Sequence, residues 1–292
     1  MCIKIDAATV ALGLFGHPVG HSLSPRFMNY AIKRLEINAR YFAFDVAAVD
    51  LKNALEGIRA LGFVGINITI PHKSAVIQHL DRVEEDADRI GAINCIYREG
   101  RLLIGANTDH SGFLRPLRER GISLKLQEAM LLGCGGAARA ASYALFNEGV
   151  SGIHVVNRTK EHAIDFIEWC EGRFPGLACS YVGNSASVSR HTAEGCGIIV
   201  NTTPVGMLPG TGASPLPSRI EIGEHQVVYD LIYNPKETTL LQRARSSGAT
   251  VINGLEMLIS QGLFALTRWF PDRKEKILAL ERELLEYTER FL

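Results

Sequence analysis

An amine and a carboxylate with several polar neighbours are the first candidates for chemistry in this sequence. The segment GINITIPHK places Asn67, Thr69 and Lys73 at the end of an apolar run that is typical of a buried strand. In α/β sheets the carboxyl ends of strands are where ligands bind. Asp109 lies in GANTDHSGF, ahead of a predicted helix, where an acidic residue is also an ordinary N-terminal helix residue. Taken singly, each side chain is better explained by a cap or turn than by catalysis, and Lys73 is at best explained equally by both.

Two serines form a second candidate group. The segment GHPVGHSLSPRFMNYA places Ser22 and Ser24 at the start of a predicted helix. Hydroxyls at such a position either cap free backbone N–H groups or hold a ligand, and both roles stay open. His17 and His21 lie in the same segment, but a proline and a glycine between them break the helical turn that would align two metal ligands. We therefore expect no metal site.

The clearest local motif is LLGCGGAARA, in which Gly133, Gly135 and Ala138 match the pattern G-x-G-x-x-A. It follows an apolar strand and opens an alanine-rich segment that favours a helix. Glycines at these positions let the backbone turn tightly and approach a pyrophosphate, whose charge meets the free N–H groups of the helix. The motif predicts a dinucleotide site whose loop also includes Gly136 and Ala137.

The next strand indicates which dinucleotide binds. An NAD site expects an acidic residue about 20 residues beyond the glycines, on the ribose 2′-hydroxyl. The strand here ends in VVNRTK, so Asn157, Arg158, Thr159 and Lys160 supply hydrogen-bond donors and two cations instead. A guanidinium pairs with phosphate through two parallel hydrogen bonds. This pattern favours NADP, and an exposed basic turn is the alternative.

Alternating strands and helices must position these groups. Apolar runs in TVALGLFG, RYFAFDV and FVGINITIP alternate with helical patterns that begin near Ser24, Asp50 and Lys73. The segment GAINCIYREGRLLIGANTDHSGF is typical of a hairpin followed by a helix near Gly112. The alternation of apolar strands and helices begins again with AMLLGC, GIHVVN, GIIVNTT and VVYDLI, which indicates a second, parallel sheet. The C-terminal segments are predicted to be helical. The sequence therefore predicts an α/β protein with two domains.

Charge and cysteine usage narrow the class of partner. Lys plus Arg and Asp plus Glu number 31 each, so no net field collects nucleic acid or an anionic membrane. The N-terminus has no signal pattern, and no apolar run approaches the roughly 20 residues that span a bilayer. The six cysteines are scattered without a CxxC pair, which suits reduced thiols. We expect a cytoplasmic protein with a small-molecule partner, either a monomer or a homodimer.

Nine segments occur in the order in which one enzyme family carries them. They are GHPVGHSLSP, GINITIPHK, GAIN, GANTDHSGF, LLGCGGAARA, VVNRT, NTTPVGM, DLIYNP and GLEMLISQG. They cover nearly the whole chain, and an ordered set is far more specific than any one motif. On these segments the chain resembles the shikimate/quinate dehydrogenase family.

The resemblance implies a division into three parts. Residues 1–115 would form an α/β substrate-binding and catalytic domain, and residues 116–250 a Rossmann-type, doubly wound NADP-binding domain. Residues 251–292 would form C-terminal helices that return to the first domain. The implied active site lies in the cleft between the domains.

The resemblance also implies roles for individual residues. Lys73 and Asp109 would form the catalytic pair, and Ser22 and Ser24 would bind the substrate carboxylate. The other residues around the substrate would be Asn67, Thr69, Asn94, Tyr233 and Gln261. The residues on the nicotinamide side would be Thr203, Gly254 and Met257, although apolar Met257 is also explained as a core residue. Leu231 would be a further cofactor-binding residue.

The implied activity is the reversible, NADP-dependent interconversion of shikimate and 3-dehydroshikimate, a step of chorismate and aromatic amino acid biosynthesis. Oxidising a secondary alcohol requires the hydroxyl proton to leave as hydride passes to the nicotinamide, so a positioned amine can carry the proton. A quinate or dual quinate/shikimate dehydrogenase, with NAD possible as the cofactor, is the alternative enzyme. A nucleotide- or ligand-sensing protein on the same fold is the non-enzyme alternative. The presence of both Lys73 and Asp109 favours an enzyme.

Four residues depart from the family pattern. Met28 stands where histidine is common, and Cys95 stands where threonine is usual. Phe270 and Pro271 replace the small residues that usually follow the last tryptophan. None is at a proton-carrying position, so the departures bear on substrate preference and on packing of the last helices, not on the reaction class.

Overall fold

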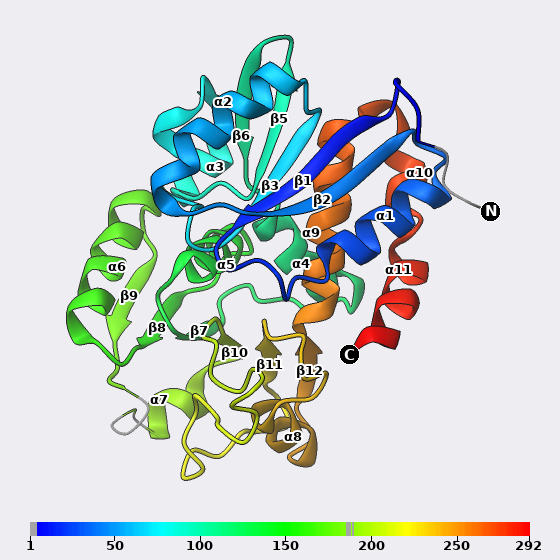
Figure 1. The fold of residues 1–292 in the computed structure, drawn as a ribbon. Coiled ribbons are helices and arrows are strands. Elements are labelled where there is room, and N and C mark those ends of the chain that lie inside the picture. Colours follow the sequence, from blue (N-terminus) through cyan, green and yellow to red (C-terminus); the bar gives the residue numbers. More distant parts are fainter. Residues whose placement is uncertain (1–4, 185–187, 189) are drawn as a thin grey trace. The chain divides into compact units, whose positions relative to one another are not determined.

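Two units make up the chain, each built on its own six-stranded sheet (Figure 1). The computed structural model describes residues 5–184, 188 and 190–292. Unit 1 holds residues 5–109 and 259–291, and unit 2 holds the described residues of 110–258. The predicted class, an α/β protein with two domains and C-terminal helices that belong to the first, is confirmed. The functional boundaries at 115/116 and 250/251 stay predictions.

The sheet of unit 1 mixes parallel and antiparallel pairs. Its strands are β1 (Val10–Gly16), β2 (Ala39–Asp45), β3 (Gly65–Ile68), β4 (Arg82–Val83), β5 (Cys95–Glu99) and β6 (Leu102–Ala106). They lie in the order β2-β1-β3-β5-β6-β4, with β1 parallel to β2 and β3. β5 runs antiparallel to both β3 and β6, so the predicted hairpin is present. β1 and β3 are apolar and mostly buried, as expected of strands covered on both faces.

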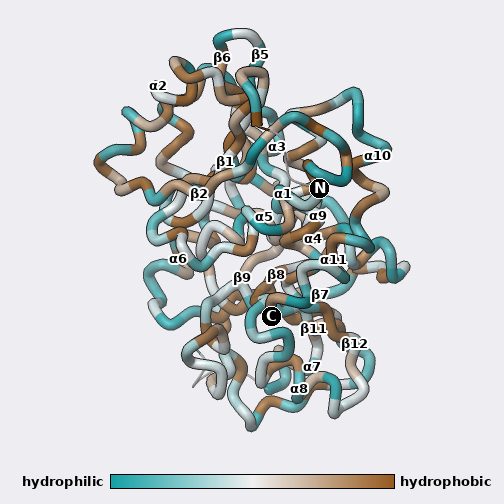
Figure 2. Tube along the Cα trace, turned by 45° about the vertical axis from the view of Figure 1, so that its right-hand side comes forward, coloured by the Kyte–Doolittle hydropathy of each residue, from teal (hydrophilic) through white to brown (hydrophobic). Residues whose placement is uncertain are grey.

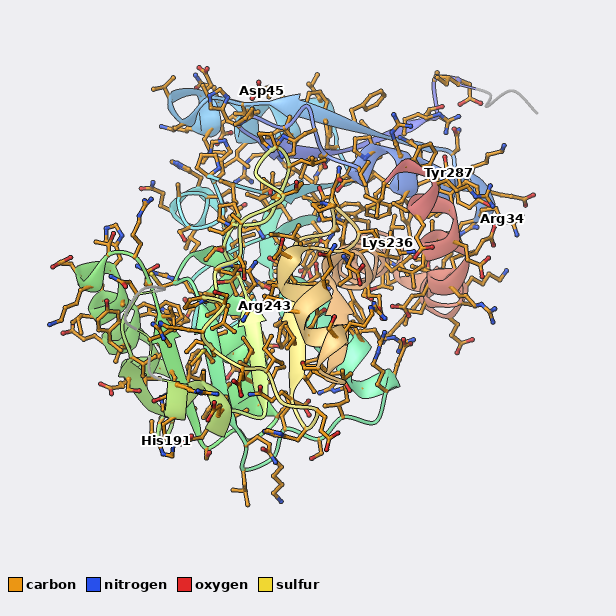
Figure 3. The ribbon with its side chains drawn as sticks, turned by 90° about the horizontal axis from the view of Figure 1, so that it is seen from below. Arg34, Asp45, His191, Lys236, Arg243 and Tyr287 are labelled. Atoms are coloured by element: carbon orange, nitrogen blue, oxygen red, sulfur yellow. The ribbon has the colours of Figure 1, made fainter. Side chains whose placement is uncertain are left out.

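The helices of unit 1 come from both ends of the chain. They are α1 (Ser24–Arg34), α2 (Leu51–Leu61), α3 (Glu85–Ile90), α10 (Lys274–Leu278) and α11 (Glu281–Thr288), with short η1 (Ala48–Asp50), η2 (Ile77–His79), η3 (Pro271–Arg273) and η4 (Glu289–Phe291). The ring of Tyr30 stacks on Tyr287 at 3.9 Å between centroids, and Glu283 accepts a 2.6 Å hydrogen bond from Tyr30. Glu283 also pairs with Arg34, which Figure 3 shows close to Tyr287. The last α-helix is thus fixed to the helix that begins at Ser24.

The outer edge of β2 is covered at one residue by a side chain. Asn29 of α1 accepts a hydrogen bond from the Tyr41 N–H at 3.0 Å and donates to the Tyr41 carbonyl at 2.7 Å. Its amide also donates to the Pro25 carbonyl at 2.8 Å, which fixes the side chain against its own helix. Asn29 therefore pairs with Tyr41 as a neighbouring strand would.

The prediction that a helix begins near Lys73 is wrong. β3 ends at Ile68, and the residues after Pro71 form turns that lead to η2. In a helix the Lys73 carbonyl would accept a hydrogen bond from the N–H four residues later. Here it accepts instead from the Ile93 N–H at 2.8 Å, so a tertiary hydrogen bond replaces the helical one.

The sheet of unit 2 is entirely parallel. Its strands are β7 (Glu128–Leu132), β8 (Gly152–Val156), β9 (Ala178–Tyr181), β10 (Ile198–Asn201), β11 (Val227–Asp230) and β12 (Thr250–Asn253). Their order, β12-β11-β10-β7-β8-β9, is that of the doubly wound dinucleotide-binding fold, with the strand order reversing between β7 and β10. The helices of unit 2 are α5 (Gly136–Asn147), α6 (Lys160–Arg173), α7 (Arg190–Gly195) and α8 (Thr239–Ser246). α4 (Asp109–Glu119) begins in unit 1 and continues in unit 2, and α9 (Gly254–Trp269) begins in unit 2 and continues in unit 1. The division between the units falls within α4 and α9.

In unit 2 the distribution of apolar residues follows the strands. Figure 2 shows apolar residues gathered in its strands and polar residues in many of the connecting loops. The four residues of β10 and the four of β11 are all buried. In the part of the chain that the structure describes, no helix combines the length and the apolar character needed to cross a membrane.

Two glycines of unit 1 should respond to alanine with opposite signs. A Cβ on Gly65 would lie 1.9 Å from Nε1 of Trp269, whose N–H donates to the Ile96 carbonyl. We expect Gly65→Ala to lower the free energy of unfolding by about 1–3 kcal/mol, because the indole must move. Gly57 lies inside α2, and a Cβ there would contact no other atom within 4 Å. Gly57→Ala should therefore raise the free energy of unfolding by about 0.5–1 kcal/mol. Urea unfolding of both variants measures the difference, and equal effects would contradict the packing of Trp269 described here.

Candidate active site

Lys73 and Asp109 form an ion pair in unit 1. Lys73 Nζ lies 2.5 Å from Asp109 Oδ2, and the side chains are only 18% and 8% exposed. Little water screens the pair, which makes the attraction stronger than at the surface. Asp109 is the first residue of α4, and its N–H donates to Asn107 Oδ1 at 2.9 Å. The amine predicted to carry a proton is thus held beside a buried carboxylate.

Asn94 joins this pair to α9. Its amide nitrogen lies 2.8 Å from Asp109 Oδ1, 2.9 Å from Thr108 Oγ1 and 3.2 Å from Gln261 Oε1. The two hydrogens of the amide are shared among these three acceptors. The Thr108 N–H donates to Asn94 Oδ1 at 2.6 Å, which fixes the amide orientation. Four predicted residues, Lys73, Asp109, Asn94 and Gln261, therefore belong to one hydrogen-bonded group.

Two members of this group were not among the predicted site residues. Thr108 donates from its hydroxyl to the Gln261 carbonyl at 3.0 Å, which fixes α9 beside the start of α4. Asn107 donates to the Ala92 carbonyl at 2.9 Å. The signal in the sequence was the polar run GANTD, in which both residues directly precede Asp109.

Asn67 and Thr69 follow the same strand but differ in their contacts. Asn67 is buried, accepts a hydrogen bond from the Tyr41 hydroxyl at 2.8 Å and donates to the Asn94 carbonyl at 3.0 Å. Its amide thus supports the backbone of Asn94. Thr69 is half-buried, and its hydroxyl makes no hydrogen bond with any residue that the structure describes. Of the two, Thr69 is the one with a group left for a ligand.

Ser22 and Ser24 lie at the N-terminus of α1, as predicted. The N-cap position is Leu23, whose side chain cannot cap, and the Ser22 hydroxyl instead accepts from the Ser24 N–H at 3.2 Å. Ser24 is buried, and within the described ranges its hydroxyl has no hydrogen-bond partner. Ser22 is therefore engaged in the helix start, whereas the hydroxyl of Ser24 is available to a ligand.

The glycine loop of unit 2 fits a dinucleotide pyrophosphate. Gly133 directly follows β7 and has a φ of 102°. A Cβ at this position would lie 2.7 Å from Thr203 Cγ2. Gly135 is the N-cap of α5 and Gly136 its first residue, followed by Ala137 and buried Ala138. A Cβ on Gly135 or Gly136 would meet nothing within 4 Å, so the approach to the helix N-terminus is open. The first turn of α5 carries no acidic residue to repel a phosphate.

The basic turn follows β8 directly. Asn157 donates to the Thr159 carbonyl at 2.8 Å, and its N–H donates to the Gly183 carbonyl. Thr159 is the N-cap of α6 and Lys160 its first residue. Arg158 is exposed and makes no ion pair with a described residue. The turn is thus shaped by Asn157, while both cations remain available to a 2′-phosphate.

Thr203 belongs to a buried network that the site prediction missed. Thr203 donates to Asn201 Oδ1 from its N–H at 3.0 Å and from its hydroxyl at 2.7 Å. Asn201 donates in turn to Asp230 Oδ1 at 2.9 Å, and Thr238 donates to Asp230 Oδ2 at 2.6 Å. Burial raises the pKa of Asp230, against the opposing effect of these hydrogen bonds. The only signal in the sequence was a polar residue at the end of each of two apolar strands.

Three other predicted cofactor residues lie close together in unit 2. The Leu231 N–H donates to the Asn201 carbonyl at 3.0 Å. A Cβ on Gly254 would lie 2.1 Å from the Leu231 carbonyl oxygen, so only glycine fits at the start of α9. Met257, one turn later, is buried, so its explanation as a core residue stays open.

Tyr233 is the one predicted substrate residue that belongs to unit 2, whereas all the others belong to unit 1. Burial raises the pKa of its hydroxyl. Its predicted contact with the substrate stays a prediction.

Comparisons with known proteins show which family the chain is similar to. The model of the shikimate dehydrogenase substrate binding domain matches residues 14–96. A protein of Moorella thermoacetica named shikimate dehydrogenase (NADP(+)) is 43% identical over 97% of this chain and 95% of its own length. One of the same name from Caldanaerobacter subterraneus is 40% identical over 96% of this chain and 98% of its own length.

A solved structure extends the likeness to the whole fold. The shikimate 5-dehydrogenase of Thermus thermophilus, in complex with NADP(H) and shikimate, is 35% identical with a TM-score of 0.82. The match covers 97% of this chain and all of that one, 100% of its residues. With relatives of this identity aligned along nearly its full length, the chain belongs to the shikimate dehydrogenase family.

Proposed function

We propose that this chain catalyses the reversible, NADP-dependent interconversion of shikimate and 3-dehydroshikimate, a step of aromatic amino acid biosynthesis. The observation that carries the proposal is the Lys73–Asp109 pair, held through Asn94 to Gln261. The names of the full-length relatives support the same reaction. A sensing protein has no need of a buried amine and carboxylate at hydrogen-bond distance, so the pair favours an enzyme.

Different residues of unit 1 transfer the proton, position the amine and bind the substrate. In its neutral form the Lys73 amine receives the proton of the reacting hydroxyl and becomes the ammonium that pairs with Asp109, and in the reverse direction this ammonium returns the proton. Asp109 holds the amine in place, and Asn94 with Gln261 fixes the carboxylate. Ser24, Ser22 and Thr69 offer hydroxyls to the substrate carboxylate and ring.

NADP is the cofactor we assign to unit 2. When bound, it supplies the carbon that accepts or donates hydride. The open N-terminus of α5 would hold the pyrophosphate, and Arg158 with Lys160 would hold the 2′-phosphate. Thr203, Leu231, Gly254 and Met257 would line the nicotinamide side.

Replacing either serine tests the substrate end of the site. If Ser22 and Ser24 bind the carboxylate, alanine at either position should raise KM for shikimate by roughly tenfold to a hundredfold, with kcat less affected. A cap alone would instead lower stability by about 1 kcal/mol with KM unchanged. A substrate titration beside a thermal melt separates the two roles, and Ser246→Ala, which removes an exposed hydroxyl of α8 bonded to the Gln242 carbonyl, is the control.

The proposed function is tested by a comparison of four rates. Shikimate and quinate are each oxidised with NADP and with NAD, and we expect the highest kcat/KM for shikimate with NADP. Faster oxidation of quinate, or a preference for NAD, would favour the alternative enzyme. No turnover in any combination, with NADP binding retained, would favour a sensing protein.

We also propose that the protein works in the cytoplasm, as either a monomer or a homodimer. The scattered cysteines and balanced charge suit the cytoplasm, where a biosynthetic dehydrogenase finds its cofactor. Both a monomer and a homodimer are compatible with the chain.

A further inference from the structure

The turn that carries Lys73 is not part of a helix or strand. Within it the His72 N–H donates to the Thr69 carbonyl at 2.9 Å, and the Val76 N–H donates to the His72 carbonyl at 3.0 Å. The Lys73 carbonyl is bound by the Ile93 N–H, as described above. The Ile77 N–H also donates to the Ser74 carbonyl at 3.3 Å, and Ser74 Oγ donates to the Gly91 carbonyl at 3.1 Å. Because the segment lies outside helices and strands, the place of the Lys73 side chain depends on such anchors of the turn.

The side chain of His72 supplies such an anchor. It is 1% exposed, and its Nε2 lies 2.7 Å from the carbonyl oxygen of Val46, just past the end of β2. A carbonyl oxygen only accepts, so Nε2 carries the hydrogen and donates. His72 directly precedes Lys73 in the chain, so this hydrogen bond fixes the backbone on which the amine is mounted.

The same short segment, Asp45 and Val46, also holds the loop that leads to the two serines. The Val46 N–H donates to the Gly16 carbonyl at 3.0 Å, and Asp45 Oδ1 lies 2.7 Å from His17 Nδ1. The His17 N–H reaches across to the Ile70 carbonyl at 3.0 Å. One anchor segment therefore holds both the turn of Lys73 and the loop that precedes Ser22.

We propose that His72 is a positioning residue for the reaction: its Nε2–H, bonded to the Val46 carbonyl, holds the turn so that Lys73 meets Asp109 and the substrate. The proposal rests on the proposed function. A side chain that merely fills space would be replaced by another ring without kinetic effect. A positioning donor requires an N–H at the place of Nε2, because displacement of a reacting group by about 1 Å can cost about a hundredfold in rate.

Three substitutions separate these roles. His72→Phe keeps a ring and removes the donor, whereas His72→Gln keeps an N–H near the position of Nε2. His72→Asn keeps the amide but is one methylene shorter, so its donor falls short of Val46. We expect kcat for shikimate oxidation to fall at least tenfold in His72→Phe and His72→Asn, with KM for shikimate within about threefold of the parent. His72→Gln should return kcat to within about threefold of the parent.

A matched control lowers the stability of unit 1 at a residue outside the turn that carries Lys73. Ile277 of α10 is fully buried in the same unit, so Ile277→Ala should destabilise the fold. If it lowers kcat as much as His72→Phe does, the effect comes from stability and the proposal is wrong. If His72→Phe fails to fold, the comparison of His72→Asn with His72→Gln carries the test alone.

Labelling of the Lys73 amine gives a readout that does not depend on turnover. Trace acetylation with acetic anhydride, followed by mass spectrometry, measures how fast each lysine reacts. We expect Lys73 to react several-fold faster in His72→Phe and His72→Asn than in the parent, because the amine leaves its buried partner. An unchanged rate in both would overturn the proposal. If the parent fails to oxidise shikimate, the proposed function fails, and labelling alone decides whether His72 positions Lys73.

Discussion

Lys73→Ala is expected to lower kcat for shikimate oxidation by about 10²–10⁴-fold, the range that a positioned general acid–base group contributes. The dissociation constant of NADP should stay within about twofold, because the glycine loop and the basic turn belong to unit 2 and Lys73 to unit 1. Steady-state rates and a fluorescence titration with NADPH measure the two quantities. Lys52→Ala, which removes an exposed lysine of α2, is the control for loss of one positive charge in the same unit.

Asp109 should act with Lys73 as one unit. Asp109→Asn keeps the shape and removes the charge that faces the amine across 2.5 Å. This variant should lower kcat as well. In the double variant, the increase in activation free energy should be smaller than the sum of the increases in the two single variants. Fully additive losses would indicate separate roles, and a near-normal kcat in Lys73→Ala would remove the lysine from the mechanism.

Arg158→Asp is expected to move cofactor preference toward NAD. The substitution removes a charge partner of the 2′-phosphate, adds repulsion and offers the 2′-hydroxyl of NAD an acceptor. Loss of a charge-assisted hydrogen bond is worth about 1.5–3 kcal/mol, or roughly tenfold to 150-fold. The ratio of kcat/KM for NADP over NAD should therefore fall at least tenfold, while Thr159 and Lys160 retain part of the original preference.

The control for Arg158 is a second charge reversal in unit 2. Lys125→Asp changes an exposed lysine outside the basic turn and should leave the ratio unchanged. Both variants are compared at one ionic strength, because salt screens the interaction. If the ratio of kcat/KM for NADP over NAD is unchanged in Arg158→Asp, or if the parent already prefers NAD, the basic turn is an exposed loop that does not bind the 2′-phosphate.

The cofactor loop could be predicted from the sequence because its constraints are local. Gly133 needs a positive φ, and Gly135 and Gly136 stand where a helix begins, so residue type reports backbone geometry directly. The parallel strands of unit 2 were predictable for a similar reason, since each is a short apolar run bounded by glycine or polar residues.

The hydrogen-bonded group around Asn94 depends on contacts that no local pattern encodes. Asn94 and Gln261 are 167 positions apart, so only the resemblance to a family placed them in one site. Thr108 and Asn107 escaped the prediction because a polar residue before a helix is ordinarily a cap. The turn of Lys73 was mistaken for a helix because the Ile93 N–H that binds its carbonyl lies on a distant segment.

The pairing of Asn29 with Tyr41 has a consequence for how copies of this protein behave at high concentration. β2 is a seven-residue edge strand with Phe42 about half exposed, the kind of edge that invites a strand from another molecule. Intermolecular strand addition needs a continuous row of free N–H and C=O groups. The Asn29 amide already occupies both groups of Tyr41, in the middle of that row. An incoming strand meets an interrupted template, so this edge is protected against aggregation by one side chain of the helix that also carries Ser24.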